Sequence, residues 1–476
     1  MLPMIIAAAI NLAIYVAVLG TGDYEWLDRA NRTMPLLLLA AGPISALLVV
    51  RREPLSVWSP VPWFLISCSA YYGVGALLLI HGNPDSVEYS NEFYPMSMAA
   101  ILDTNALNAL GVFVVCSTIA LLTSRFPRSR DRAYAPVRKQ DIRRLLWTFM
   151  IVGVPIKYFL AIPNAFGILG FVLPSAFGSL ALMTGFVTLQ SWYLSFADSK
   201  KYLGLAIPFT LLELLVAFLT FSKLEVLLTL VMVFLGMYFA RPSRNLIAVA
   251  AVVVVVTYRA SVGFVTAGRE ALARGDDAGY ANRLKFSAQY VSGDVSARSR
   301  TDRLTQAWWT RLNYANTQGF AMHEFDRGAP GDTFAILPYV FIPRIIWADK
   351  PTMNLGAHFN YLATGNDYSA SAPGVFAEAY WNGGWAAVVI VCIYIGSLFS
   401  WFYVLSRRHM RRLDFRWLPT GMFGIIMGLR PDDWFVAAFA GSVVIAVGYY
   451  LIIKVALPFQ SEIESPVLNS EVAPAA

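Results

Sequence analysis

The chain has 476 residues, of which 57% are hydrophobic and only 14% are charged, and its formal net charge is +7. Soluble domains usually contain about 25% charged residues, so this chain has too few to cover a water-facing surface. The composition excludes a soluble globular protein and indicates an all-α, polytopic membrane protein. The basic residues lie mostly in short connectors between apolar runs, which argues against a nucleic-acid partner.

The N-terminal residues 1–20 are apolar and lack both a basic start and a clean small-residue cleavage site. We therefore interpret them as the first membrane span and not as a signal peptide. Cys68, Cys116 and Cys392 all lie inside apolar segments. We expect them to be packing residues, because their positions suggest neither a disulfide framework nor a metal site.

A helix needs about 20 mostly apolar residues to cross a bilayer, and this length gives about twelve candidate spans. Basic residues follow the second, fourth, sixth, eighth and tenth candidates. All these basic connectors lie on one side if both termini are cytoplasmic. The candidates lie near 2–20, 33–50, 62–80, 101–123, 145–162, 174–195, 202–220, 225–240, 245–265, 384–405, 417–430 and 434–454.

The connector after the ninth candidate is much longer than the others, and it divides the chain into four regions. Residues 1–265 are predicted to form a transmembrane bundle of about nine spans, and 266–382 a large, partly helical loop on the non-cytoplasmic side. Residues 383–456 are predicted to form the last spans, and 457–476 a disordered tail. The late part of the loop is rich in prolines, which oppose a regular helix, so we expect it to form an active-site lid.

Ionisable residues inside spans cost about 2.5–3.5 kcal/mol each at the membrane centre and are functional candidates by default. Apart from Glu213, those of this chain cluster toward the side that carries the large loop, which snorkelling alone does not predict. Simple ion pairs, such as Lys223 with Glu225 or Arg430 with Asp433, are the structural alternative. The set comprises Asp103, Lys157, Glu213, Lys223, Glu225, Arg259, Arg430, Asp432 and Asp433.

Many strong cationic donors lie on this side, which favours an anionic ligand such as a lipid-linked diphosphate, because guanidinium groups bind phosphate through two hydrogen bonds. The candidate phosphate-binding residues are Lys223, Arg259, Arg303, Arg311, Arg344, Lys350 and Arg430.

A carboxylate beside these cations would serve as general base. Glu378 is the leading candidate, with Asp349 and His358 as alternatives, although a histidine in an aromatic loop is also commonly a structural residue. No metal-ligand spacing, catalytic triad or glycine-rich phosphate loop is present, so we expect neither a metal nor another cofactor. The aromatic residues of this side, such as Trp381 and Trp385, fit either a membrane-interface belt or stacking on sugar rings.

One stretch resembles a known family. It contains Pro343-Arg344-Ile345-Ile346-Trp347, Lys350-Pro351, Gly356 before Phe359, a Ser369–Pro373 turn, and Glu378-Ala379-Tyr380-Trp381-Asn382-Gly383-Gly384. In a chain of many spans with a large late external loop, this order resembles the oligosaccharide repeat-unit polymerases, the Wzy-type polymerases of O-antigen or exopolysaccharide. The resemblance covers Pro343–Gly384 most closely. The family's second arginine-rich loop has no counterpart here, because residues 162–174 are uncharged.

The resemblance implies a bacterial inner-membrane enzyme that joins undecaprenyl-diphosphate-linked repeat units on the outer face of that membrane. It implies that arginines of the loop bind the diphosphates and that no nucleotide sugar or metal takes part. From the positions of the cations we assign this binding to Arg344 and Arg311, with Arg259 and Arg430 deeper. A chain-length regulator and a flippase are the implied protein partners. The alternatives are an O-antigen ligase, a transporter or flippase of lipid-linked glycans, and a non-catalytic scaffold of envelope synthesis.

Overall fold

The computed structural model describes residues 1–21, 23–125, 137–166, 183–273, 280–292, 307–340, 342, 355–366 and 370–458. Within these ranges the regular secondary structure is helical and no strand occurs. The chain forms two compact units. Unit 1 comprises Met1–Tyr134 and Leu304–Tyr450, and unit 2 comprises Ala135–Arg303 and Leu451–Ala476.

The predicted loop over residues 266–382 contributes described helices to both units. Its first part packs on helices of unit 2, where α14 (Tyr280–Ser292) contacts α11 (Leu203–Leu219). Its remainder packs within unit 1, where α16 (Ala315–Asp326) contacts α6 (Met98–Arg125) and α19 (Val375–Arg411). Apolar side chains of α16, among them Phe320, Ala321 and Met322, are buried by this packing, which a hydropathy profile does not reveal.

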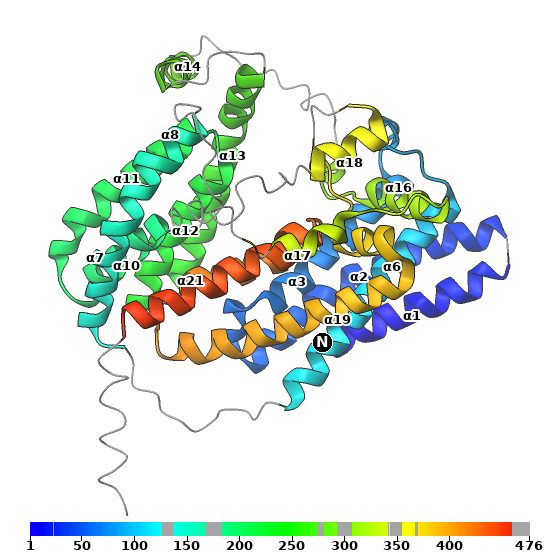
Figure 1. Cartoon of the computed structure of the whole chain (residues 1–476), viewed down its shortest axis with the longest axis horizontal. Helices are drawn as coiled ribbons and strands as arrows, with labels where there is room; N and C mark the ends of the chain where they lie inside the picture. Colours follow the sequence, from blue (N-terminus) through cyan, green and yellow to red (C-terminus); the bar gives the residue numbers. More distant parts are fainter. Residues whose placement is uncertain are drawn as a thin grey trace, which may run out of the picture. The chain divides into compact units, whose positions relative to one another are not determined.

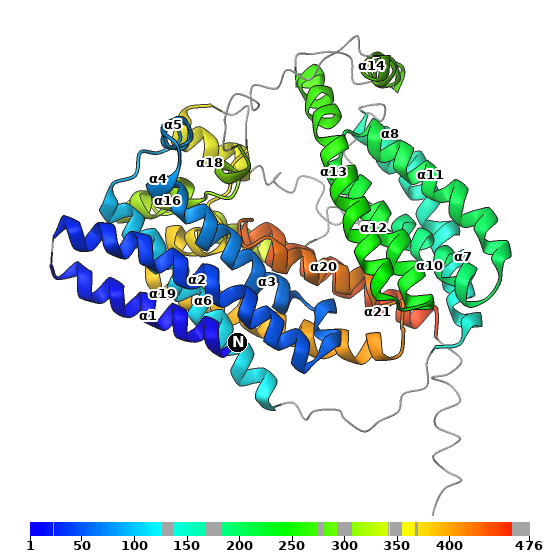
Figure 2. The same cartoon turned by 180° about the vertical axis from the view of Figure 1, so that it is seen from behind.

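Unit 1 is a bundle of long apolar helices, with shorter helices gathered beside them (Figures 1 and 2). Its elements, besides α6, α16 and α19, are α1 (Leu2–Leu19), α2 (Tyr24–Arg52), η1 (Pro54–Trp58), α3 (Pro60–Cys68), η2 (Ser69–Val74), η3 (Gly75–Leu77), α4 (Leu78–His81), α5 (Pro84–Asn91), α15 (Ala307–Thr310), η7 (Thr333–Ile336), α17 (Leu337–Val340), α18 (Leu355–Thr364), α20 (Leu418–Leu429), η8 (Phe435–Gly441) and the first part of α21 (Ser442–Ala456).

The helices α6 and α19 pack closely because both carry glycine at the contact. A Cβ atom at Gly396 would lie 2.9 Å from the Val115 carbonyl oxygen, and one at Gly111 would lie 2.7 Å from ring atoms of Phe376. Small residues at such contacts let the helix backbones approach, which is how membrane helices gain packing energy. The α19 helix is also interrupted at Gly383–Gly384, where Gly384 has φ +61°. Its first two turns therefore form a separate segment.

Unit 2 is a second helical bundle. In both views α14 is seen along its axis while α11 and α13 are seen from the side, so α14 crosses the ends of these helices (Figures 1 and 2). Besides α11 and α14, its helices are α7 (Lys139–Pro155), η4 (Ile156–Ala161), α8 (Ile162–Ala165), α10 (Met183–Ala197), η5 (Lys200–Tyr202), α12 (Lys223–Ala240) and α13 (Arg244–Ala273).

Nine helical segments of the described residues are long and apolar enough to cross a membrane, which identifies an all-α polytopic membrane protein. The predicted count of twelve is not confirmed. α20 has only 12 residues, and α10 has 15 described residues. Several helices also start or end outside the predicted apolar windows, since backbone hydrogen bonding continues through polar residues: α2 starts at Tyr24, α13 runs to Ala273 and α19 starts at Val375.

Two of the predicted basic connectors meet within unit 1. The carboxylate of Glu53, just after α2, lies 3.1 Å from Arg407 Nε and 3.2 Å from Arg411 Nη2 at the end of α19. The ends of α2 and α19 therefore lie on the same side of the bundle. The three cysteines are buried and unbonded, which confirms the prediction that they are packing residues.

Candidate functional site

Arg430 and Arg311 are the two predicted phosphate-binding residues whose side chains the structure describes in unit 1. Arg430 follows α20 and is 54% exposed, and its Nη1 lies 3.1 Å from Oδ2 of Asp433. This is the simple ion pair that the sequence offered as the structural alternative. Arg311 is exposed in the turn between α15 and α16. The two arginines belong to segments that meet, because Tyr314 and Asp432 are hydrogen bonded to each other.

The loop 430–434 between α20 and η8 is fixed by hydrogen bonds to its carbonyl groups. The Pro431 oxygen accepts from the Val375 N–H at 3.1 Å and from the Tyr72 hydroxyl at 3.2 Å. Just before the loop, the Leu429 oxygen accepts from the Ser67 hydroxyl at 3.1 Å. Because three separate elements hold this short segment, its side chains have defined directions.

The turn at residues 309–314 packs against η2 and η3, which lie in the third apolar segment. Trp309 Nε1 donates to the Val74 oxygen at 2.5 Å. A Cβ at Gly75 would lie 1.9 Å from the Leu312 oxygen, so only glycine fits at this contact. The rings of Tyr71 and Tyr314 meet edge to face at 5.4 Å. Residues 69–74 form a π-helical turn, a feature often found at functional sites.

Asp432 lies where these segments meet. Its side chain is buried, with 7% of the residue exposed, and its Oδ2 accepts a 2.9 Å hydrogen bond from the Tyr314 hydroxyl. Its Oδ1 is buried and has no hydrogen-bond partner among the residues that the structure describes. Burial raises the pKa of Asp432, while the nearby Arg430 charge and the Tyr314 hydrogen bond oppose that rise. The group therefore combines a spare acceptor atom with a basicity above that of an ordinary aspartate.

Glu378, the predicted general base, lies in the first turn of α19 and is fully buried. Its Oε1 accepts from the Thr333 hydroxyl at 2.8 Å, and its Oε2 accepts from the Phe435 N–H. The neighbouring Asn382 also donates to the Thr333 hydroxyl at 2.8 Å and accepts from the Phe334 N–H at 3.1 Å. Glu378 thus joins α19, η7 and the start of η8. Its catalytic role stays a prediction.

The other predicted site residues are distributed as follows. His358 is exposed on α18, whereas Arg303, Arg344, Asp349 and Lys350 lie outside the described residues. Arg259 is exposed on α13, and Lys223 is partly buried at the start of α12; both belong to unit 2.

Most aromatic residues of the 307–385 region pack against each other. Phe359 contacts Trp381 at 5.4 Å and Trp434 at 5.6 Å between ring centroids, and Trp381 is buried and donates to the Ala329 oxygen. This location corrects the assignment of Trp381 to a membrane-interface belt, because helix packing removes the ring from the surface. Trp308 and Tyr361 remain exposed and are the better candidates for contact with a sugar or a membrane.

Unit 2 contains a buried ion pair among its membrane helices. Lys157 Nζ lies 2.5 Å from Oε2 of Glu213, and the Tyr158 hydroxyl donates to Oε1 at 2.6 Å. Lys157 and Tyr158 both lie on η4, a π-helical turn of the kind often found at functional sites. The sequence indicated Lys157 and Glu213 as candidates but did not predict that they pair.

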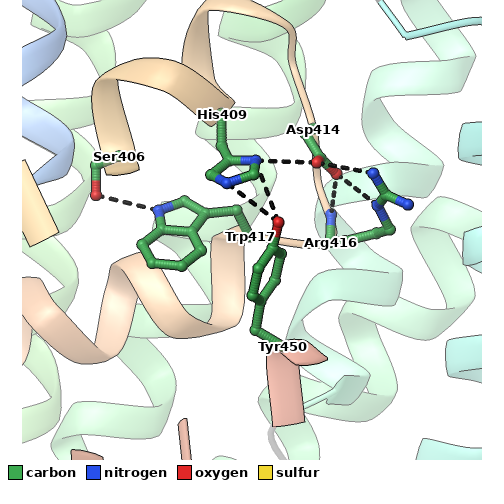
Figure 3. A network of polar contacts seen from close by, with 6 residues as sticks. All are labelled: Ser406, His409, Asp414, Arg416, Trp417 and Tyr450. Carbon is green, nitrogen blue, oxygen red and sulfur yellow. Dashed lines mark hydrogen bonds and ion pairs between the residues drawn. The ribbon is translucent and has the colours of Figure 1, made fainter. Parts of the chain in front are cut away.

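A polar network that the sequence did not predict lies at the junction of α19 and α20 (Figure 3). Its central residue, His409, has no histidine or cysteine at metal-ligand spacing, so no motif marked it as a candidate. His409 lies 3.0 Å from the Asp414 carboxylate and 3.1 Å from the Tyr450 hydroxyl. Arg416 donates to both Asp414 oxygens, at 2.9 Å and 3.0 Å. Within the described ranges, no three His, Cys, Asp or Glu side chains are grouped so that they could hold a metal ion.

Comparison with known proteins adds no relative: no family model, curated protein or solved structure matches the chain. The class that the fold defines is therefore a multi-pass, all-helical membrane protein with a polar cluster at the α20–η8 loop.

Proposed function

We propose that this protein is a membrane-embedded glycosyltransferase that polymerises undecaprenyl-diphosphate-linked oligosaccharide repeat units into O-antigen or exopolysaccharide. It would act at the outer face of the bacterial inner membrane, with about twelve spans, both termini cytoplasmic and the long 266–382 segment periplasmic. The meeting of the Glu53, Arg407 and Arg411 side chains supports this topology, since it puts two basic connectors on one side.

The observation that carries the proposal is the arrangement around the α20–η8 loop. An exposed guanidinium, Arg430, lies beside two carboxylates, Asp432 and Asp433, and the hydroxyl of Tyr314, from the long segment, is hydrogen bonded to Asp432. A cation for the diphosphate and a carboxylate for the acceptor hydroxyl are the two groups that glycosyl transfer from a diphosphate requires. The resemblance of Pro343–Gly384 to the repeat-unit polymerases supports the same reaction.

In the proposed reaction, a sugar hydroxyl of one lipid-linked unit attacks the anomeric carbon of the growing chain. The bond from that carbon to the diphosphate oxygen breaks, and the lipid diphosphate leaves with the electron pair. The hydroxyl proton passes to a carboxylate of the protein. Arg430, Arg311 and Arg344 stabilise the charge that develops on the leaving diphosphate, as positioned donors do in other transfer reactions.

The test is to incubate the purified protein, in nanodiscs, with a lipid-linked repeat unit and to separate the products by size. We expect a ladder of polymers, with Arg430→Ala and Arg344→Ala each giving at least ten-fold less product than wild type. Lys285→Met, on the exposed face of α14, is the control for loss of a cation and should leave the ladder unchanged.

Other products would contradict the proposal. Transfer of glycan to a lipid A core without a ladder would indicate a ligase. Movement of the lipid-linked unit between leaflets without a new glycosidic bond would indicate a flippase.

A further inference from the structure

The Oδ1 atom of Asp432 is the feature that the proposed function leaves unexplained. Buried polar atoms in proteins almost always have a hydrogen-bond partner, so a buried carboxylate oxygen without one calls for a donor from elsewhere. Oδ2 accepts from the Tyr314 hydroxyl, the Tyr71 side chain lies close to the same carboxylate, and Oδ1 has no hydrogen bond of normal geometry from the described residues. A hydroxyl group of a ligand is one such donor.

The structure holds this atom in a fixed direction. The carbonyl group of the preceding residue, Pro431, is bonded to Val375 and Tyr72, and Tyr314 holds the opposite oxygen of the carboxylate. Arg430, two residues earlier, is exposed. A ligand whose diphosphate binds at Arg430 therefore brings its sugar close to Asp432.

Glu378 differs from Asp432 in this respect. Both of its oxygens already accept hydrogen bonds from the protein, from Thr333 and from the Phe435 N–H. To act as a base it would have to break contacts that join three elements. Its bond to Phe435 instead fixes the start of η8, directly after the loop that carries Asp432.

We propose that Asp432 is the general base of the transfer reaction, and that Glu378 is a positioning residue that anchors the loop behind it. The assignment rests on the proposed function. The acceptor hydroxyl donates to Oδ1, and its proton moves to Oδ1 as its oxygen bonds to the anomeric carbon and the diphosphate departs. The charged or titratable groups around Asp432 are Arg430, Asp433, Tyr314, Tyr71 and Tyr72.

The first experiment compares Asp432→Asn with Asp326→Asn in the polymerisation assay. Asp326 is a matched control, because it also accepts a 2.9 Å hydrogen bond from a tyrosine hydroxyl, that of Tyr380, but it is exposed. General bases contribute about 10²–10⁴-fold to rate. We expect Asp432→Asn to lower kcat at least 100-fold with little change in KM for the lipid-linked unit, and Asp326→Asn to have wild-type kinetics. Equal rates for the two variants would overturn the assignment while leaving the polymerase function intact.

The second experiment uses Tyr314→Phe, which remains informative if Asp432→Asn does not fold. Loss of the Tyr314 hydrogen bond removes a contact that favours the ionised carboxylate, so the acidic limb of the kcat–pH profile should move to higher pH. Glu378→Gln should lower the rate without moving that limb. An unmoved limb in Tyr314→Phe would refute the assignment. If wild-type protein forms no glycosidic bond, the proposed function fails, and the assignment fails with it.

Discussion

His409 Nδ1 lies 3.0 Å from Oδ2 of Asp414, five residues later in the chain, and this contact closes the connection between α19 and α20. The intervening Leu413 adopts a left-handed conformation with φ +53°, which is uncommon for a residue with a side chain. Trp417 stacks on the His409 ring at 5.1 Å, and Arg416 binds the same carboxylate (Figure 3). The network therefore offsets the strain of a tight turn at one end of α20, while Arg430 and Asp432 follow its other end.

Asp414→Asn should destabilise unit 1. Arg416 is only 1% exposed, and neutralising Asp414 breaks a buried ion pair from one side, which typically costs about 3–5 kcal/mol. The free energy of unfolding, measured by denaturant titration in micelles, should fall by this amount at neutral pH. Asp85→Asn, on the exposed face of α5, is the control and should be within experimental error of wild type.

Asp414 also makes the stability of the fold depend on pH. Burial alone would raise the pKa of Asp414, but the hydrogen bonds and charges of His409 and Arg416 outweigh it and lower the pKa to about 2. The pKa of Asp414 in the folded state lies below its ordinary value of 3.8. The stabilisation by its ionised carboxylate is therefore fully present above pH 3.8 and is lost as the pH falls from 3.8 toward 2. The shift corresponds to about 2 kcal/mol. An Asp414→Asn protein whose acid unfolding between these pH values matches wild type would contradict this account.

In unit 2, Glu213→Ala should be strongly destabilising, because it leaves the buried Lys157 ammonium without its partner. Breaking a buried pair from one side costs about 3–5 kcal/mol, whereas replacing both partners by apolar groups is often neutral or stabilising. The double variant Lys157→Met/Glu213→Leu should therefore regain near-wild-type stability. Thermal unfolding of the single and double variants measures the difference. A double variant no more stable than Glu213→Ala would show that the pair is not the source of the effect.

The sequence predicts the helical class and most membrane segments, because an apolar run of about 20 residues has few alternatives to a spanning helix. It also offers Arg430 with Asp433 as a simple ion pair, because the two opposite charges lie three residues apart. It does not predict that Tyr314 reaches Asp432, 118 residues away, because no local pattern encodes that contact. Likewise, an alternating aromatic and polar stretch gives no sign that Trp381 is buried. The signal available for Asp432 was its place in a pair of adjacent aspartates after an apolar helix.

Gly396→Val should separate α6 from α19. The added side chain meets the Val115 carbonyl oxygen at 2.9 Å and Thr118 Cβ at 2.7 Å, and the backbone oxygen cannot move aside. Overpacking of this kind typically costs about 1–3 kcal/mol. Gly448→Val adds the same side chain in α21, where nothing lies within 4 Å, so its melting temperature should stay close to that of wild type. Equal melting temperatures for the two variants would contradict a close α6–α19 contact.

Glu378→Ala should lower stability more than Glu378→Gln does. Alanine leaves the Thr333 hydroxyl and the buried Phe435 N–H without their acceptor, and each such loss costs about 1–3 kcal/mol. Glutamine keeps the size and one acceptor oxygen, so it preserves one of the two contacts. The melting temperatures of the two variants, with the exposed Glu88→Ala as control, measure this order. A Glu378→Gln protein with wild-type stability and no polymerising activity would instead assign the chemistry to Glu378, and Asp432 would then be the supporting residue.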